Sequence, residues 1–117
     1  MLTLGIPPRV FVATEPVDMR GSFDALAGHV RRLHADPLDG GLYLFFSRNR
    51  RLLKALWFDR TGWALFSKRL ERGTYQLPEA APGANQVAVD AAQLAMILEG
   101  IDLDARRRLR YHPHVRA

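Results

Sequence analysis

Residues 41–72, GLYLFFSRNRRLLKALWFDRTGWALFSKRLER, constrain the fold more than any other part of the chain. Three apolar runs rich in leucine and aromatic residues are separated there by two short polar breaks. Runs of about five to eight residues between turn-forming segments favour strands over a buried helix. We therefore predict an antiparallel meander over residues 42–69, in which two hairpins share the middle strand.

Two turns define this meander. Asn49 lies in the first polar break and tolerates the backbone of a tight reversal. The second break, residues 59–62, has aspartate at its start and glycine at its end, which fits a type I turn. The middle run, residues 52–58, has apolar side chains on both faces, which is typical of a central strand covered on both sides.

The segments around the meander predict an α+β domain with a mostly antiparallel sheet of four or five strands. Residues 9–14 form a short β-branched and aromatic run that ends before Pro16, and we interpret it as the first strand. Residues 73–78 are expected to add an edge strand. Residues 79–86 are small, polar and proline-bearing, which indicates an exposed loop.

A first amphipathic helix is predicted from about residue 19 to residue 35, because apolar side chains recur there at spacings of three and four. Asp18 can cap its start. Asp36-Pro37 ends the helix, since the residue before proline is disfavoured in helical geometry. Arg20 and Asp24 lie four residues apart and are expected to form an ion pair.

A second helix is predicted over about residues 90–99. Asp90 can serve as its N-cap, with Gln93 as the capping-box partner three residues later. Val89 is placed to contact Leu94 as a hydrophobic staple. The residues expected to be largely buried are Phe23, Leu26, Val30, Leu44, Leu56, Leu65, Leu94 and Leu98.

Length and composition indicate a single soluble domain. A chain of 117 residues has material for one core, and we assign residues 1–103 to the domain and 104–117 to a basic, flexible C-terminal tail. The absence of cysteine excludes disulfides, thiolate zinc sites and a cysteine nucleophile, and it suits a reducing cytoplasm. No apolar run approaches the roughly 18 residues of a membrane span, so we predict a cytoplasmic protein.

The formal net charge of +5 is concentrated in two regions. Residues 48–72 contain eight basic and two acidic residues, and residues 102–117 contain five arginines. Arginine forks match phosphate geometry, although biased codon usage would give the same preference for arginine over lysine. The candidate nucleic-acid contacts are Arg48, Arg50, Arg51, Lys54, Lys68, Arg69, Arg72, Arg106, Arg107, Arg108 and Arg110.

Catalysis is not expected from this sequence. Two-metal DNA cleavage needs several convergent carboxylates. The available acidic residues have simpler roles as caps, a turn former and ion-pair or strand-end partners: Asp18, Asp24, Asp59, Glu71 and Asp90. His112 and His114 lack a third metal ligand nearby. The chain also has no nucleophile elbow, phosphate loop or dinucleotide fingerprint. We predict no enzyme activity, no metal site and no cofactor.

Four motifs resemble those of a known family. They are Asp18-Met19-Arg20 with Ser22-Phe23-Asp24, Trp57-Phe58-Asp59 with Gly62, the Lys68-to-Gly73 segment, and Ala92-Gln93-Leu94 leading to Leu98-Glu99-Gly100. In this order, over residues 9–103, they resemble the TnpB-type accessory proteins encoded by the second open reading frame of IS66-family bacterial insertion sequences. The first hairpin departs from the family pattern, because its turn is shorter. The resemblance implies participation in transposition beside a separate transposase that carries the DNA-cutting chemistry.

Two functional hypotheses remain open at this point. In the first, the protein is a non-catalytic accessory factor that binds DNA phosphates through the basic rim of its sheet and its arginine-rich tail. In the second, it is an interaction module that recruits or regulates the transposase without binding DNA itself. A basic surface serves both, and the sequence leaves open the oligomeric state, the specificity and the choice between DNA and RNA.

Overall fold

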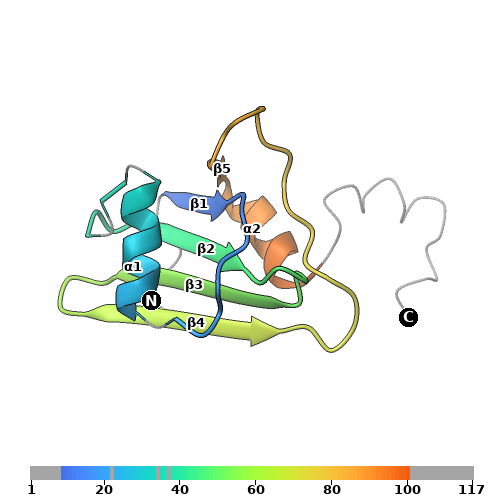
Figure 1. Ribbon diagram of the computed structural model, residues 1–117, viewed down its shortest axis with the longest axis horizontal. Coiled ribbons are helices and arrows are strands. Elements are labelled where there is room, and N and C mark those ends of the chain that lie inside the picture. The colour runs from blue at the N-terminus through green and yellow to red at the C-terminus, as the bar shows by residue number, and fades with distance from the viewer. Residues whose placement is uncertain (1–8, 22, 34, 37, 101–117) are drawn as a thin grey trace.

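The computed structural model describes residues 9–21, 23–33, 35–36 and 38–100. They form a five-stranded sheet with order β4-β3-β2-β1-β5 and two helices (Figure 1). The pairing is mostly antiparallel, which confirms the predicted α+β class. In chain order the elements are β1 (Val10–Ala13), α1 (Phe23–Arg32), β2 (Leu42–Phe46), β3 (Leu52–Phe58), β4 (Trp63–Arg69), β5 (Gln86–Val89) and α2 (Ala91–Leu98).

The predicted meander is confirmed, since β2, β3 and β4 pair consecutively and antiparallel. In the first turn the Asn49 side chain accepts a hydrogen bond from the Arg51 N–H (3.1 Å), while Arg50 takes the left-handed backbone conformation (φ 57°). In the second turn Arg60 has φ 87°. A type I turn needs negative φ at both central residues, so that predicted turn type is wrong.

Non-local pairing accounts for the parts of the sheet that were predicted incorrectly. β1 lies parallel to β2, and α1 falls within the crossover between them. β5 pairs with β1 along the sheet edge, although no strand was expected there. Residues 73–78 form no strand, so the predicted edge strand is wrong. Tyr75 is nevertheless fully buried, because it packs beneath the sheet rather than along its edge.

The two helices cover opposite faces of the sheet (Figure 1). On one face, Leu26, Ala27 and Val30 of α1 pack against the inward side chains of β2 and β3. On the other, Leu94 and Ile97 of α2 join a cluster with Tyr75 and the remaining core residues of the central strands. All five residues of β2 are therefore buried, which explains its continuous apolar sequence.

α1 is shorter than predicted, and its start differs in detail. The helix begins at Phe23, so Asp18 is not its cap. The Asp18 carboxylate instead accepts hydrogen bonds from the Arg20 backbone and guanidinium, which replaces the expected pairing of Arg20 with Asp24. Phe23 is 40% exposed, contrary to the prediction, because it is the first residue of the helix and precedes the buried residues Leu26, Ala27 and Val30.

α2 follows its sequence signals closely. The Asp90 side chain accepts from the Gln93 N–H (2.8 Å), and the Gln93 side chain accepts from the Asp90 N–H (3.0 Å), which confirms the capping box. Val89 belongs to the same apolar cluster as Leu94. Leu98 is only partly buried, since it ends the helix.

Leu65 is also less buried than predicted, because it lies on the edge strand β4 and has a neighbouring strand on one side only. Neither helix in the described part of the chain is long and apolar enough to cross a membrane.

Candidate nucleic-acid interface

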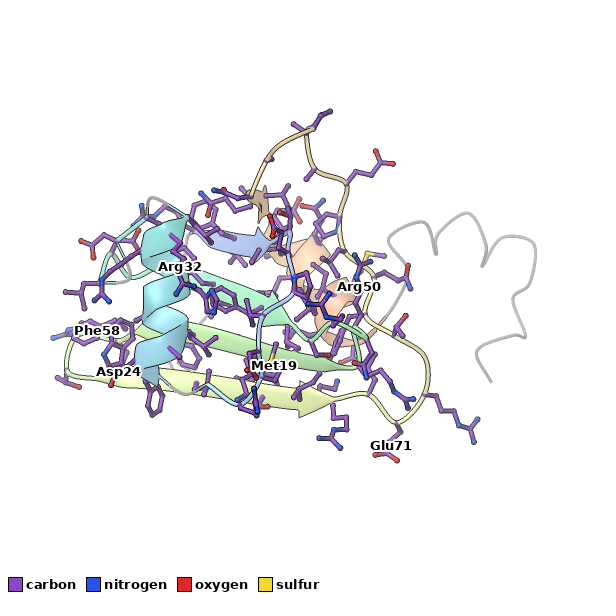
Figure 2. All side chains as sticks on the ribbon, in the orientation of Figure 1. Met19, Asp24, Arg32, Arg50, Phe58 and Glu71 are labelled. Atoms are coloured by element: carbon purple, nitrogen blue, oxygen red, sulfur yellow. The ribbon has the colours of Figure 1, made fainter. Side chains whose placement is uncertain are left out.

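Five of the predicted contact residues come together at one end of the sheet. The β2–β3 turn lies beside the segment that follows β4, because the Leu70 N–H donates to the Arg51 carbonyl (2.9 Å) and the Tyr75 N–H donates to the Arg50 carbonyl (2.7 Å). Figure 2 shows Arg50 and Glu71 at this end. The exposed residues Arg48, Arg50, Arg51, Arg69 and Arg72, which we call the arginine end, are therefore neighbours.

The guanidinium groups of the arginine end are largely available to an external anion. Among the described residues, Arg48, Arg50, Arg69 and Arg72 make no side-chain hydrogen bond and no ion pair with a carboxylate. Arg51 donates to the Glu71 backbone carbonyl (3.3 Å), a contact that leaves its other donors available. These exposed side chains can pair with phosphate oxygens in the fork geometry that arginine favours.

A shallow depression of about 430 Å³ lies within the arginine end. It is lined by Ser47, Asn49, Arg51, Leu52 and Arg69. Two guanidinium groups and the Asn49 amide nitrogen thus border a space open to solvent, whereas the Ser47 hydroxyl donates to the Asn49 side-chain oxygen (2.8 Å). This donor set suits the oxygens of a phosphate group.

The two lysines have a different role from the arginines. The Lys54 ammonium donates to the carbonyls of Met19 (2.6 Å) and Gly21 (3.1 Å), on the α1 side of the sheet. The Lys68 ammonium donates to the Leu98 carbonyl (2.7 Å) at the end of α2, where the helix dipole favours a cation. Both ammonium groups are thus hydrogen-bonded to backbone carbonyls, on opposite faces of the sheet, and neither belongs to the arginine end.

The chain also leaves the described domain at the arginine end. Gly100 has φ 73°, and a Cβ atom at this position would come within 3.1 Å of the Leu70 side chain. Residue 100 is therefore adjacent to the segment between Arg69 and Arg72. The other predicted contacts, Arg106, Arg107, Arg108 and Arg110, lie outside the described residues, as do His112 and His114.

One cation near this end was not among the predicted contacts. This cation is Arg20. The Val17 N–H donates to the Phe46 carbonyl (3.0 Å), so the segment that contains Arg20 lies beside the end of β2. Arg20 and Arg48 both line a second depression there, of about 380 Å³. The Arg20 guanidinium hydrogen-bonds the Asp18 carboxylate and lowers the pKa of Asp18 to about 2. The Asp18-Met19-Arg20 motif was the available sequence signal, but it was assigned to a helix start.

Arg20→Gln is expected to raise the pKa of Asp18 from about 2 toward the ordinary aspartate range, measured by NMR titration of its carboxyl carbon. Because the folded-state pKa is depressed, the contribution of this pair to stability is present above the unfolded-state pKa near 4 and is lost as the pH falls toward about 2. Arg48→Gln is the matched control and should leave the titration nearly unchanged. Equal shifts in both variants would contradict a specific Asp18–Arg20 pair.

The acidic residues of the described domain are dispersed over structural positions. Asp90 caps α2, and Asp59 accepts a hydrogen bond from the Gly62 N–H within the β3–β4 turn. Within the described ranges, no group of three or more histidine and acidic side chains is placed to hold a metal ion. The feature that the fold assembles is therefore a cluster of cations.

Comparison with known proteins gives a consistent result. The family model described as "IS66 Orf2 like protein" matches residues 8–108. Protein y4hO of Sinorhizobium fredii (strain NBRC 101917 / NGR234) is 46% identical over 103 residues, which cover 87% of this chain and 88% of the relative. Protein y4jC of the same strain is 30% identical over 95 residues, or 80% of each chain. No solved structure matches. Since the family match spans the whole described domain, this chain is a member of the IS66 Orf2-like family of insertion-sequence accessory proteins.

Proposed function

We propose that the protein is a non-catalytic accessory factor in transposition of an IS66-type element and that it binds the DNA phosphate backbone through its arginine end. Family membership supports the role in transposition. The observation that supports DNA binding is the convergence of five exposed arginines from two separate segments at one end of the sheet. In this proposal the protein acts in the cytoplasm, beside the transposase of the same element.

The position of the chain exit supports a second set of contacts. Residues 106–110 contain four arginines and follow Gly100, which lies at the arginine end. The arginine end and the tail can therefore meet neighbouring phosphates of one nucleic acid. Such contacts set position and affinity without reading bases, so we expect little sequence preference from them.

The aromatic residues favour backbone contacts over base stacking. Tyr43, Phe45 and Trp57 are buried in the core. Phe58 and Trp63 stack edge-on beside the β3–β4 turn, at the opposite end of β3 from the arginine end. Phe66 is exposed at the middle of β4, on the face of the sheet that carries Lys68 rather than Arg69. Among the described residues, the arginine end itself thus includes no exposed ring on which an unpaired base could stack, which favours a duplex ligand over a single strand.

Fluorescence anisotropy with a labelled duplex of about 25 base pairs tests the proposal at about 50 mM salt. We expect binding to element-end DNA and to unrelated DNA with affinities that agree within a few-fold. No measurable binding by a folded sample would contradict the DNA-binding role. Co-purification with the transposase in that case would favour the interaction-module hypothesis.

The non-catalytic part of the proposal has its own test. With magnesium or manganese, the purified protein should neither cut nor join DNA, because no convergent carboxylate set has been identified in the described domain. Metal-dependent cleavage that is abolished by changing Asp18, Asp24 or Asp59 would contradict this expectation.

A further inference from the structure

The outer edge of β4 presents a row of backbone groups to solvent. The Leu70 N–H donates to the Arg51 carbonyl, and the Asp59 N–H donates to the Gly62 carbonyl. These two hydrogen bonds fix which residue pairs of β3 and β4 are hydrogen-bonded, because such pairs recur at every second residue of an antiparallel ladder. Even-numbered residues of β4 therefore bond to β3. Trp63, Leu65, Ser67 and Arg69 direct their N–H and C=O groups away from the sheet, where no described segment pairs with them.

Phe66 adds exposed apolar surface at the same edge. The large apolar side chains that are exposed in the described domain are Phe23, Leu38 and Phe66. Phe66 is the central residue of β4 and is 38% exposed. Phe23 begins α1 just after Gly21, whose carbonyl is bound by Lys54, and Lys54 pairs directly with Ser67 of β4. The first turn of α1 thus lies at the β4 side of the sheet (Figure 1), but on the face opposite to that of Phe66, because Phe66 alternates with Ser67 along β4.

The sequence of β4 is complementary to itself in one antiparallel register. If two copies pair about Phe66, Trp63 lies opposite the partner's Arg69, and Leu65 lies opposite the partner's Ser67. These positions carry the outward backbone groups, so this register satisfies all of them. Phe66 then faces the partner's Phe66 in a non-hydrogen-bonded pair, where side chains approach most closely.

The charges of β4 also fit this register. Lys68 lies opposite the partner's Ala64, so no two cations face each other directly. Arg69 lies opposite the partner's Trp63, a pair that can form a cation–π contact. Charged side chains on an edge strand commonly prevent association, because like charges face each other when two such strands pair. In the register centred on Phe66, no two cations of β4 face each other directly.

We propose that the protein forms a twofold homodimer by antiparallel pairing of β4 with β4 of a second copy, centred on Phe66. The two five-stranded sheets then form one continuous sheet. The two arginine ends would lie about 20 Å apart along the strand direction, because six residues of extended chain separate the positions of Arg69 in the two strands. The inference does not depend on nucleic-acid binding.

Sedimentation velocity on Phe66 charge variants tests this dimer. Phe66→Lys and Phe66→Glu each place like charges directly opposite one another, and each should weaken self-association at least about 30-fold. An equimolar mixture of the two variants should restore the dimer, because the charges at the centre are then opposite. Failure of the folded mixture to associate would contradict the register.

Ser67→Pro gives an independent test that leaves Phe66 in place. Proline is tolerated on an edge strand where the lost N–H faces solvent, so the monomer fold should persist, as circular dichroism can show. The dimer loses two hydrogen bonds and gains a steric clash, so the dissociation constant should rise at least about 30-fold. Ser67→Ala is the matched control and should remain dimeric.

Amide exchange locates the interface in the wild-type protein. Protection of the outward Leu65 and Ser67 amides should increase with protein concentration, whereas that of the inward Phe66 amide should change little. A protein that remains monomeric at about 500 μM would overturn the proposal. A dimer that tolerates both Ser67→Pro and Phe66→Lys would overturn it equally.

Discussion

Replacing Tyr75 by alanine is expected to lower the free energy of unfolding by about 3 to 5 kcal/mol. Tyr75 lies in a segment without regular structure, yet its side chain is fully buried with its ring centroid 5.4 Å from that of Phe46. Its N–H donates to the Arg50 carbonyl (2.7 Å) and its hydroxyl donates to the Lys68 carbonyl (3.0 Å). The backbone of Tyr75 thus joins the β2–β3 turn, and its side chain joins the end of β4 to the core beneath α2.

Urea denaturation followed by tryptophan fluorescence measures this effect. Tyr75→Phe keeps the ring and loses only the hydroxyl, so it should cost about 0.5 to 1.5 kcal/mol. Thr74→Ala, at the exposed neighbouring position, should change the free energy of unfolding by no more than about 0.5 kcal/mol. A loss for Tyr75→Ala as small as that for Thr74→Ala would contradict the role of this segment as a core anchor.

Neutralising the arginine end should weaken DNA binding by about 100- to 1,000-fold, the second large effect that we expect. The variant combines Arg48→Gln, Arg50→Gln, Arg69→Gln and Arg72→Gln. Each side chain is exposed, so the fold should be preserved. Because phosphate contacts do not read sequence, affinity for unrelated and element-end duplexes should fall by similar factors in anisotropy titrations.

A matched pair of double variants separates position from net charge. Arg50→Gln with Arg69→Gln removes two charges from the arginine end. Arg31→Gln with Arg60→Gln removes two exposed charges from α1 and from the β3–β4 turn at the opposite end of β3. We expect the first pair to weaken binding at least about tenfold and the second by less than about threefold. Equal losses would indicate that total charge, rather than the arginine end, determines affinity.

Local signals in the sequence predicted the parts of the fold that depend on near neighbours. The meander followed from turn-forming residues between apolar runs, and the capping box of α2 followed from Asp90 and Gln93 alone. Contacts between distant segments were not readable in this way. β5 is a strand because Val87 and Val89 pair with β1, more than 70 residues earlier in the chain, and not because of its own short sequence.

The candidate site shows the same division. Sequence identified the basic segment, but it grouped Lys54 and Lys68 with the arginines because all are cations. Strand alternation directs the two lysines to opposite faces of the sheet. There the Lys54 ammonium donates to the Met19 carbonyl before α1, and the Lys68 ammonium donates to the Leu98 carbonyl at the end of α2. The arginine end itself depends on Tyr75 and Leu70, whose N–H groups hold the segment after β4 against the first turn. No local pattern encodes that contact.

The salt dependence of DNA affinity tests the central claim most directly, since counterion release counts the phosphates that the protein contacts. If the arginine end and the tail together contact about four to six phosphates, log affinity should fall with log salt at a slope of about −4 to −5. A chain ending at residue 105 should remain folded and give a shallower slope. A slope near zero for the full chain, or one unchanged by neutralising the arginine end, would contradict phosphate recognition by this surface.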